Sequence, residues 1–184
     1  MDMSYRISTV ASSTKLKRIV SGGQTGVDRA ALDAALGAGF PCGGWVPGDR
    51  MAEDGVIPER YPLMALPNGN YQQRTRLNVV DSDGTALLYS DFLTSGTRLT
   101  SDLCELLNRP CILISAREIP DPYAAAEVVW RFIEDNGIGV LNVGGPRASG
   151  WPAGYGFSRA VIAEVIKKET AEPISTRRGV DACG

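Results

Sequence analysis

Residues Val20–Leu36 read VSGGQTGVDRAALDAAL, and this stretch decides the fold of the chain. An apolar run ends at Ser21, a glycine-rich turn follows, and an alanine-rich helical segment begins near Val27. Because glycine has no Cβ, such a turn can bend sharply or bring its backbone close to a ligand. The free N–H groups at a helix start favour negative charge. This strand, glycine turn and helix therefore predict a cradle for an anion, most simply a phosphate.

Length and composition indicate one domain with a sizeable core. The chain has 184 residues and a formal net charge of −2, which disfavours nucleic acid as a partner. No stretch is long and apolar enough to span a membrane, and the N-terminus lacks the apolar core of a signal peptide. We therefore expect a cytoplasmic protein without membrane contact.

The absence of histidine restricts the chemistry that the chain can perform. With no histidine in the sequence, Ser-His-Asp catalysis, Cys-His catalysis and His-ligated zinc are excluded within this chain. Acid–base work would fall to carboxylates, Lys, Tyr or groups of the ligand. The four cysteines form no C-x-x-C pair, so we expect free thiols, with Cys104 and Cys111 in the core.

Short apolar strands alternate with helices along the chain, which is typical of a parallel sheet covered on both faces. The predicted strands are 16–22, 40–45, 85–90, 111–116 and 139–145. The predicted helices lie within 27–38, 70–84, 94–110, 121–137 and 154–168. We predict a single Rossmann-like, doubly wound α/β domain, with about five mostly parallel strands and helices on both faces. The ligand-binding domain would span 16–168, between a flexible N-terminal arm at 1–15 and a C-terminal tail at 169–184.

Two local features add expectations of their own. Residues 46–62 form a long loop rich in Pro, Gly and charge, and loops of this length are usually functional or disordered. In the helix within 94–110, the apolar spacing predicts that four leucines face inward. These are Leu99, Leu103, Leu106 and Leu107.

Most predicted strands are followed by residues that suit an anion site. In open parallel sheets, ligands bind at the carboxyl ends of the strands, so we expect these segments to share one site. The predicted ligand-binding residues are Gly22, Gly23, Gln24, Thr25 and Gly26 after the first strand, Gly44 and Trp45 after the second, Ser95, Gly96, Thr97 and Arg98 after the third, and Gly144, Gly145 and Arg147 after the fifth.

The glycine motif is neither a P-loop nor a dinucleotide fingerprint. No Gly-Lys-Ser/Thr follows it, and the acid that would bind a ribose is missing after the second strand. Simpler structural roles stay open at this stage. The motif could be a tight turn, Thr97 a helix cap, and Trp45 a packing residue instead of a platform for a flat ring. Arg98 and Arg147 could clamp a phosphate or lie in solvent.

Three further polar residues have two interpretations each. Asp28 could cap the first turn of its helix or contact the ligand. Arg74 and Asn78 could pin the long loop or line a subunit contact, with ligand contact as the alternative.

Taken together, these motifs resemble those of the molybdenum cofactor carrier proteins over roughly residues 18–167. That family is similar to a Rossmann-like group that includes the Lonely Guy phosphoribohydrolases and DNA-processing protein A. The order and combination of the pieces are specific, although no single piece is. They are SGGQTGVDRAALDAA (21–35), GGWVPGDRMAEDGVIPERYPL (43–63), RTRLNVVDSDGTALL (74–88), TSGT (94–97) and NVGGPRAS (142–149).

The resemblance implies a binding protein, a carrier or sensor, for a phosphorylated ring ligand. That ligand would be the molybdenum cofactor (molybdopterin) or a nucleotide-like molecule. It places Gly22–Gly26, Gly96, Thr97 and Gly144–Arg147 around the phosphate. The cofactor's own dithiolene would hold the metal, so no protein-ligated metal is expected. The resemblance also implies a homo-oligomer and a molybdoenzyme as acceptor.

An enzyme is the alternative, a phosphoribohydrolase that cleaves the N-glycosidic bond of nucleoside 5'-monophosphates. Its catalytic carboxylate would be Asp91 or Glu53, with Asp54 and Glu59 as further candidates. The related hydrolases carry a glutamate about three residues after their Gly-Thr pair, where this chain has Thr100. The family also tends to carry a cysteine after Gly-Gly-Trp, where this chain has a valine. Both departures weigh against hydrolysis or a thiol role, and the sequence leaves the question of catalysis open.

Overall fold

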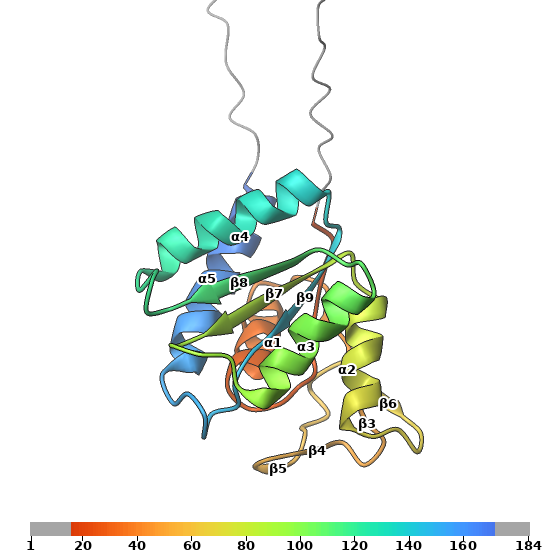
Figure 1. Ribbon diagram of the computed structural model, residues 1–184. Helices are drawn as coiled ribbons and strands as arrows, with labels where there is room; N and C mark the ends of the chain where they lie inside the picture. Colours follow the sequence, from red (N-terminus) through yellow and green to blue (C-terminus); the bar gives the residue numbers. More distant parts are fainter. Residues whose placement is uncertain (1–15, 172–184) are drawn as a thin grey trace, which may run out of the picture.

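The computed structural model describes residues 16–171 (Figure 1). The arm predicted at 1–15 and residues 172–184 of the predicted tail lie outside the described residues. The elements are β1 (Arg18–Val20), α1 (Val27–Gly37), β2 (Cys42–Gly43), β3 (Trp45–Pro47), β4 (Met51–Ala52), β5 (Gly55–Val56), β6 (Met64–Leu66), α2 (Tyr71–Val80), β7 (Gly84–Tyr89), α3 (Ser95–Leu106), β8 (Cys111–Ser115), α4 (Pro122–Asn136), β9 (Val140–Gly144) and α5 (Gly154–Thr170).

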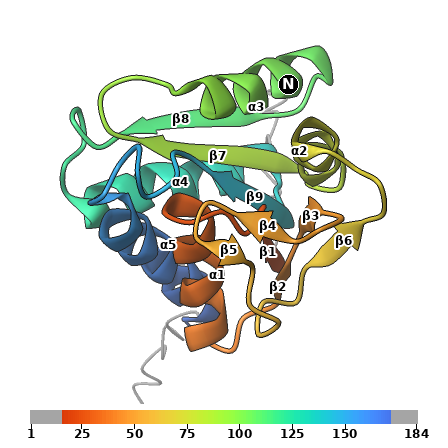
Figure 2. The same cartoon turned by 90° about the horizontal axis from the view of Figure 1, so that it is seen from below.

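A five-stranded sheet in the order β2-β1-β9-β7-β8 forms the middle layer. Every neighbouring pair of its strands is parallel. Helices α1, α4 and α5 pack together on one face, while α2 and α3 contact each other on the opposite face (Figure 2). The prediction of a doubly wound α/β domain is confirmed.

The last strand of the chain, β9, lies at the centre of the sheet. If the strands are counted from β7, their spatial order becomes 2-1-3-4-5, a common order among doubly wound sheets. The neighbours β7 and β9 lead to helices on opposite faces, α3 and α5 (Figure 2). The connections therefore diverge at the carboxyl ends of β7 and β9, where such sheets bind ligands.

The main core lies between the sheet and α1, α4 and α5. Strand β7 is almost wholly buried, with Ala86, Leu87 and Leu88 at 0% exposure, because helices cover both of its faces. The alanines of α1 bring that helix close to the sheet, and Ala30 and Ala31 are fully buried. Between residues 16 and 171, no helix combines the length and the apolar character needed to cross a membrane.

The segment expected as a long loop, 46–62, has its own secondary structure and its own small core. Strands β3 and β6 pair in parallel, and β4 and β5 form an antiparallel pair. Ile57 and Tyr61 are buried with Val46, Leu63 and Leu32 of α1 in a second apolar cluster. The expectation of an irregular loop was wrong, because its few apolar residues pack with one another and with Leu32 of α1.

One leucine of α3 does not face inward as expected. Leu106 is 79% exposed, whereas Leu99, Leu103 and Leu107 are half-buried. Helix α3 contacts β8, at the edge of the sheet, and its neighbour β7, and the buried residues of α3 are limited to Thr97 and Cys104. Cys104 is thus buried as predicted, while Cys111 is half-buried.

Gly44 allows β1 and the segment after β2 to approach each other, which gives a test of the fold. Its φ is +137°, and an added Cβ would overlap the carbonyl oxygen of Ser21. We expect Gly44→Ala to lower the free energy of unfolding by about 2–4 kcal/mol, measured by urea denaturation. The matched control is Gly156→Ala in α5, where an added Cβ meets no atom within 4 Å. That control should be neutral or stabilising by up to about 1 kcal/mol, and equal losses in both variants would contradict the prediction.

Candidate functional site

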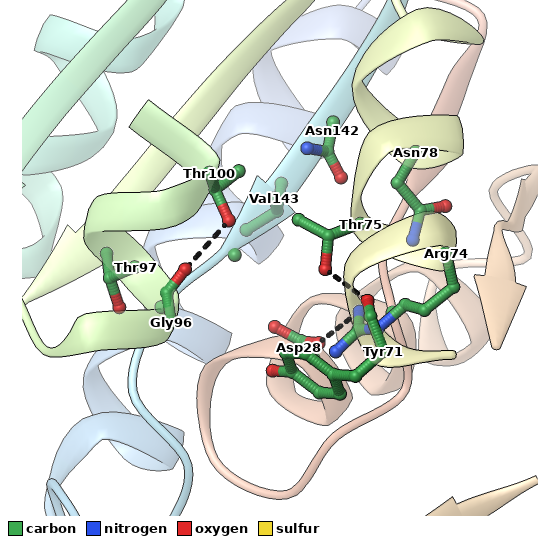
Figure 3. Close-up of a pocket in the computed structure, with 13 residues that line it drawn as sticks. Asp28, Tyr71, Arg74, Thr75, Asn78, Gly96, Thr97, Thr100, Asn142 and Val143 are labelled. Atoms are coloured by element: carbon green, nitrogen blue, oxygen red, sulfur yellow. Dashed lines mark hydrogen bonds and ion pairs between the residues drawn. The ribbon is translucent and has the colours of Figure 1, made fainter. Parts of the chain in front are cut away.

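A polar depression opens between the carboxyl ends of the central strands and the starts of α2 and α3 (Figure 3). Its deep part, the inner cup, has a volume of about 30 Å³. The inner cup is lined by Gly22, Asp28, Tyr71, Arg74, Thr75, Asn78, Gly96, Thr97, Thr100, Asn142, Val143, Gly144 and Gly145. The outer groove beside it has a volume of about 370 Å³. The outer groove is lined by Tyr71, Thr94, Ser95, Gly96, Thr97, Gly145, Arg147, Ser149 and Gly150.

The start of α3 contributes backbone donors to this depression. Thr94 is the N-cap of α3, but its side chain makes no capping hydrogen bond. Its hydroxyl instead lies 3.0 Å from the hydroxyl of Thr97. The Ser95–Thr97 segment lines the outer groove, so the first turn of α3 presents uncapped N–H groups where an anion would be stabilised.

Arg74 of α2 is a buried cation in the inner cup. Helix α2 begins with a capping box between Asn70 and Gln73, which fixes the first turn. Arg74 is 5% exposed, and its guanidinium lies 4.2 Å from the ring centroid of Tyr71. Its Nη1 lies 3.5 Å from Oδ2 of Asp28, but its buried Nε has no hydrogen-bond partner. A desolvated cation with an unused donor favours an added anionic acceptor.

Asp28 lies opposite Arg74, in the first turn of α1, and is 5% exposed. Its Oδ2 accepts a hydrogen bond from the backbone N–H of Gln24 at 3.3 Å. Burial raises the pKa of Asp28, and the nearby Arg74 partly opposes that rise. Gly22 fits between the two because it has no side chain, and an added Cβ there would overlap the guanidinium of Arg74.

The fold brings part of the predicted site together. Members of three predicted segments, which follow β1, β7 and β9, line the inner cup or the outer groove. They are Gly22, Ser95, Gly96, Thr97, Gly144, Gly145 and Arg147. The remaining predicted residues are not part of either lining, and their contact with a ligand stays a prediction. They are Gly23, Gln24, Thr25, Gly26, Gly44, Trp45 and Arg98.

The rest of the glycine turn packs against other parts of the protein. An added Cβ on Gly23 would press on Leu63 of the second apolar cluster, and one on Gly26 would press on the backbone of Pro146. The side-chain oxygen of Gln24 accepts hydrogen bonds from the backbone N–H groups of Thr25 and Glu53. These glycines are therefore explained by close packing.

Trp45 and Asn78 connect β3 to α2. The Asn78 side chain accepts from the backbone N–H of Trp45 at 2.8 Å and donates to its carbonyl at 3.1 Å. The indole N–H of Trp45 donates to Asp81 at 2.7 Å. Asn78 therefore pins the long segment, the first of the roles considered for it, and its side of α2 also borders the inner cup.

The carboxylates proposed as catalytic lie outside both linings. Glu53 accepts hydrogen bonds from the hydroxyl of Thr25 at 2.6 Å and from the hydroxyl of Ser149 at 2.7 Å. Asp91 lies 3.4 Å from Arg117 in an exposed ion pair. Asp54 pairs with Arg29, and Glu59 is exposed. The carboxylate that does line the inner cup is Asp28.

Several residues that line the inner cup were not among the ligand-binding residues predicted from the sequence, and for Arg74 ligand contact was only the alternative to a structural role. Tyr71, Arg74 and Thr75 come from α2, where the buried face is polar, and Asn142 interrupts the apolar run of β9. The sequence signal that could have identified them is the presence of polar residues at positions where a helix or strand of this fold is buried. Within residues 16–171, no three His, Cys, Asp or Glu side chains gather as a metal site.

Glu53 stabilises the rim of the site in a pH-dependent way. Hydrogen bonds from Thr25 and Ser149 lower the pKa of Glu53 below its usual 4.5. A lowered folded-state pKa gives stability that is present above the unfolded value and lost as pH falls through the folded value. We therefore expect Glu53→Gln to lower the melting temperature at pH 7, with a smaller difference from wild type at an acidic pH below 4.5, where the stabilisation by the carboxylate is being lost. Glu59→Gln is the exposed control and should change little at either pH. A Glu53→Gln difference that stays constant with pH would contradict the assignment.

Comparison with known proteins agrees with the fold and with the family resemblance predicted from the sequence. Residues 19–166 match the family model cpYpsA, the circularly permutated YpsA SLOG family. The position of the last strand at the sheet centre suits a permuted chain order. No curated protein matches the chain.

One solved structure shares both the fold and much of the sequence. It is a crystal structure described as a putative molybdenum carrier protein from Syntrophus aciditrophicus SB. The two chains are 39% identical with a TM-score of 0.80, over 83% of this chain and 96% of that chain. With most of its length matched by the family model, this chain belongs to the circularly permutated YpsA SLOG family.

Proposed function

We propose that this protein binds and carries a phosphorylated ring ligand, with the phosphate in the inner cup and the ring in the outer groove. The observation that carries the proposal is the buried Arg74, whose Nε has no partner. The uncapped start of α3 borders the same space. A cation and a helix N-terminus that meet in one small cavity favour an oxyanion.

The size of the inner cup supports a phosphate in it. A volume of about 30 Å³ accommodates roughly two or three water-sized groups. That is enough for oxygens of a phosphate and too little for a ring. Thr97 and Thr100 line this space. The hydroxyl of Thr100 donates to the carbonyl of Gly96 at 3.1 Å. The hydroxyl of Thr97 can donate to an anion when it accepts from the hydroxyl of Thr94, 3.0 Å away.

The outer groove suits the rest of such a ligand. Its volume of about 370 Å³ falls in the usual range for small-molecule sites, about 300–1,000 Å³. Tyr71 borders both spaces and is 38% exposed. Arg74 covers one face of its ring, so a flat heterocycle would contact the part of the ring that Arg74 leaves exposed. The side chain of Arg147 lines the groove and is 52% exposed, with its Nε 3.8 Å from a carboxylate oxygen of Glu53. The remaining N–H groups of its guanidinium could contact further negative charge on the ligand.

Among phosphorylated ring molecules, we favour the molybdenum cofactor as cargo. The similar Syntrophus protein is described as a molybdenum carrier, and the cofactor is a pterin with a phosphate. The described residues provide donors for that phosphate and a tyrosine for the ring. The metal would stay with the cofactor's own dithiolene, and a molybdoenzyme would accept the cargo.

The phosphate position can be tested at Gly96. An added Cβ there meets only the Tyr71 hydroxyl, at 3.7 Å. Gly96→Asp places a negative charge in the first turn of α3, which suits the helix but repels an anion. We expect this variant to keep its melting temperature and to bind molybdopterin at least about tenfold more weakly in calorimetry.

The matched control for this test is Gly96→Ala, which adds the Cβ without the charge. It should bind molybdopterin within about threefold of wild type, a difference below 1 kcal/mol. Inorganic phosphate and nucleoside monophosphates serve as additional probes. Weak, indistinguishable binding of all probes to wild type, or unchanged binding to Gly96→Asp, would refute the proposal.

The hydrolase alternative receives one supporting observation, the carboxyl group of Asp28 in the inner cup. We nevertheless expect no release of free base from nucleoside 5'-monophosphates. The assay incubates the substrates with micromolar protein for hours and measures the free base by chromatography. The carboxylates considered earlier are held in other contacts, Glu53 by Ser149 and Asp91 by Arg117. Turnover that is lost in Asp91→Asn or Glu53→Gln would favour the enzyme over the carrier.

A further inference from the structure

We propose that anion binding in the inner cup takes up one proton, shared between Asp28 and the anion. The cup would then prefer an oxyanion that can carry a proton, a phosphate or phosphate monoester, over one that stays fully ionised, such as sulfate or molybdate. This inference rests on the proposed function, because it assigns a specificity to the same site.

The geometry places a cation and a carboxyl group within one small buried space. Figure 3 shows the carboxyl group of Asp28 beside the guanidinium of Arg74, with the Gly96 segment across the cup. Both side chains are 5% exposed, and their closest charged atoms are 3.5 Å apart. With a volume of about 30 Å³, the cup brings any bound oxyanion close to both groups.

The charge balance in this space requires a proton. Arg74 and ionised Asp28 together carry no net charge, so a dianion would leave two uncompensated negative charges in a buried site. Two oxyanions in contact cannot both remain fully ionised, and one proton between them forms a strong hydrogen bond. A phosphate monoester has its second pKa near 6, so at pH 7.5 it is mainly a dianion that can take this proton from solvent when it binds, whereas sulfate stays fully ionised.

No second cation faces Asp28 among the charged side chains of residues 16–171. Arg74 is the charged group that acts on Asp28 from α2, and the turn before α1 adds the backbone N–H groups of Gln24 and Gly22, which carry no charge. The end of β9 contributes Gly144, which has no charge. Arg29, next in the chain, is turned away to Asp54 and the carbonyl of Gly23. Burial also raises the pKa of Asp28 before any anion binds, so the proton has a ready acceptor.

Calorimetry on the wild-type chain tests proton uptake directly. Phosphate, methyl phosphate, sulfate and molybdate are titrated at pH 7.5 in buffers of different ionisation enthalpy. Because phosphate binds or releases protons itself, the count refers to the whole reaction at that pH. We expect close to one proton taken up per phosphate or methyl phosphate bound, and a preference for phosphate over sulfate of about tenfold or more. Methyl phosphate that binds at least as well as inorganic phosphate identifies the monoester as the ligand form, and weaker binding identifies free phosphate.

The Asp28→Asn variant separates the carboxyl group from the rest of the site. Asn keeps the shape of Asp without the negative charge, so sulfate should bind more tightly and the preference for phosphate should fall to within about threefold. Proton uptake should fall with it, and the melting temperature reports whether the variant is folded. If Asp28→Asn does not fold, the proton uptake measured on wild type still tests the proposal.

The possible failures are distinguishable. Wild type that binds no phosphate or methyl phosphate refutes the proposed function itself. Wild type that binds phosphate and sulfate equally, without proton uptake, refutes the role of Asp28 and leaves the phosphate site standing. A preference for phosphate that persists unchanged in folded Asp28→Asn also refutes it.

Discussion

The buried contact between Arg74 and Asp28 is the interaction on which the site depends. It joins α2, on one face of the sheet, to the start of α1, on the other face, across the carboxyl end of β1. Removing two opposite charges from water is costly, so such a pair is weak evidence for stability in itself. Its consequence here is local. It requires glycine at position 22 and leaves Nε of Arg74 without a partner.

A second set of contacts holds the rim of the site in place. Glu53, in the turn between β4 and β5, accepts hydrogen bonds from Thr25 and Ser149. The Thr25 hydroxyl also accepts from the backbone N–H of Ala148. Three segments far apart in sequence are thereby fastened together next to the outer groove. The glycine turn after β1 is thus packed on both sides, and Gly22 is the residue of this turn that lines the inner cup.

Much of the fold followed from local patterns. Alternating apolar strands and helices predicted the parallel sheet, and the helix ends at Asp121 and Gly137 agree with the cap residues of α4. The ligand-binding residues were predicted less completely than the fold from the glycine-rich segments. Gly96, Thr97, Gly144 and Gly145 do line the inner cup, because each follows the carboxyl end of a strand, where parallel sheets gather their loops.

The sequence by itself determined the layers of this protein. The spacing of apolar residues and the residues at turns are local properties, so each short stretch predicts its own helix or strand without knowledge of tertiary contacts. The sequence also determined that histidine chemistry is absent and that glycine-rich turns follow several strands. Only the tertiary structure decided which of those turns meet, and that Arg74 of α2 reaches Asp28 of α1. Arg74 and Asp28 are 46 positions apart in the chain, so their contact depends on how the helices pack across the sheet, which no local pattern records.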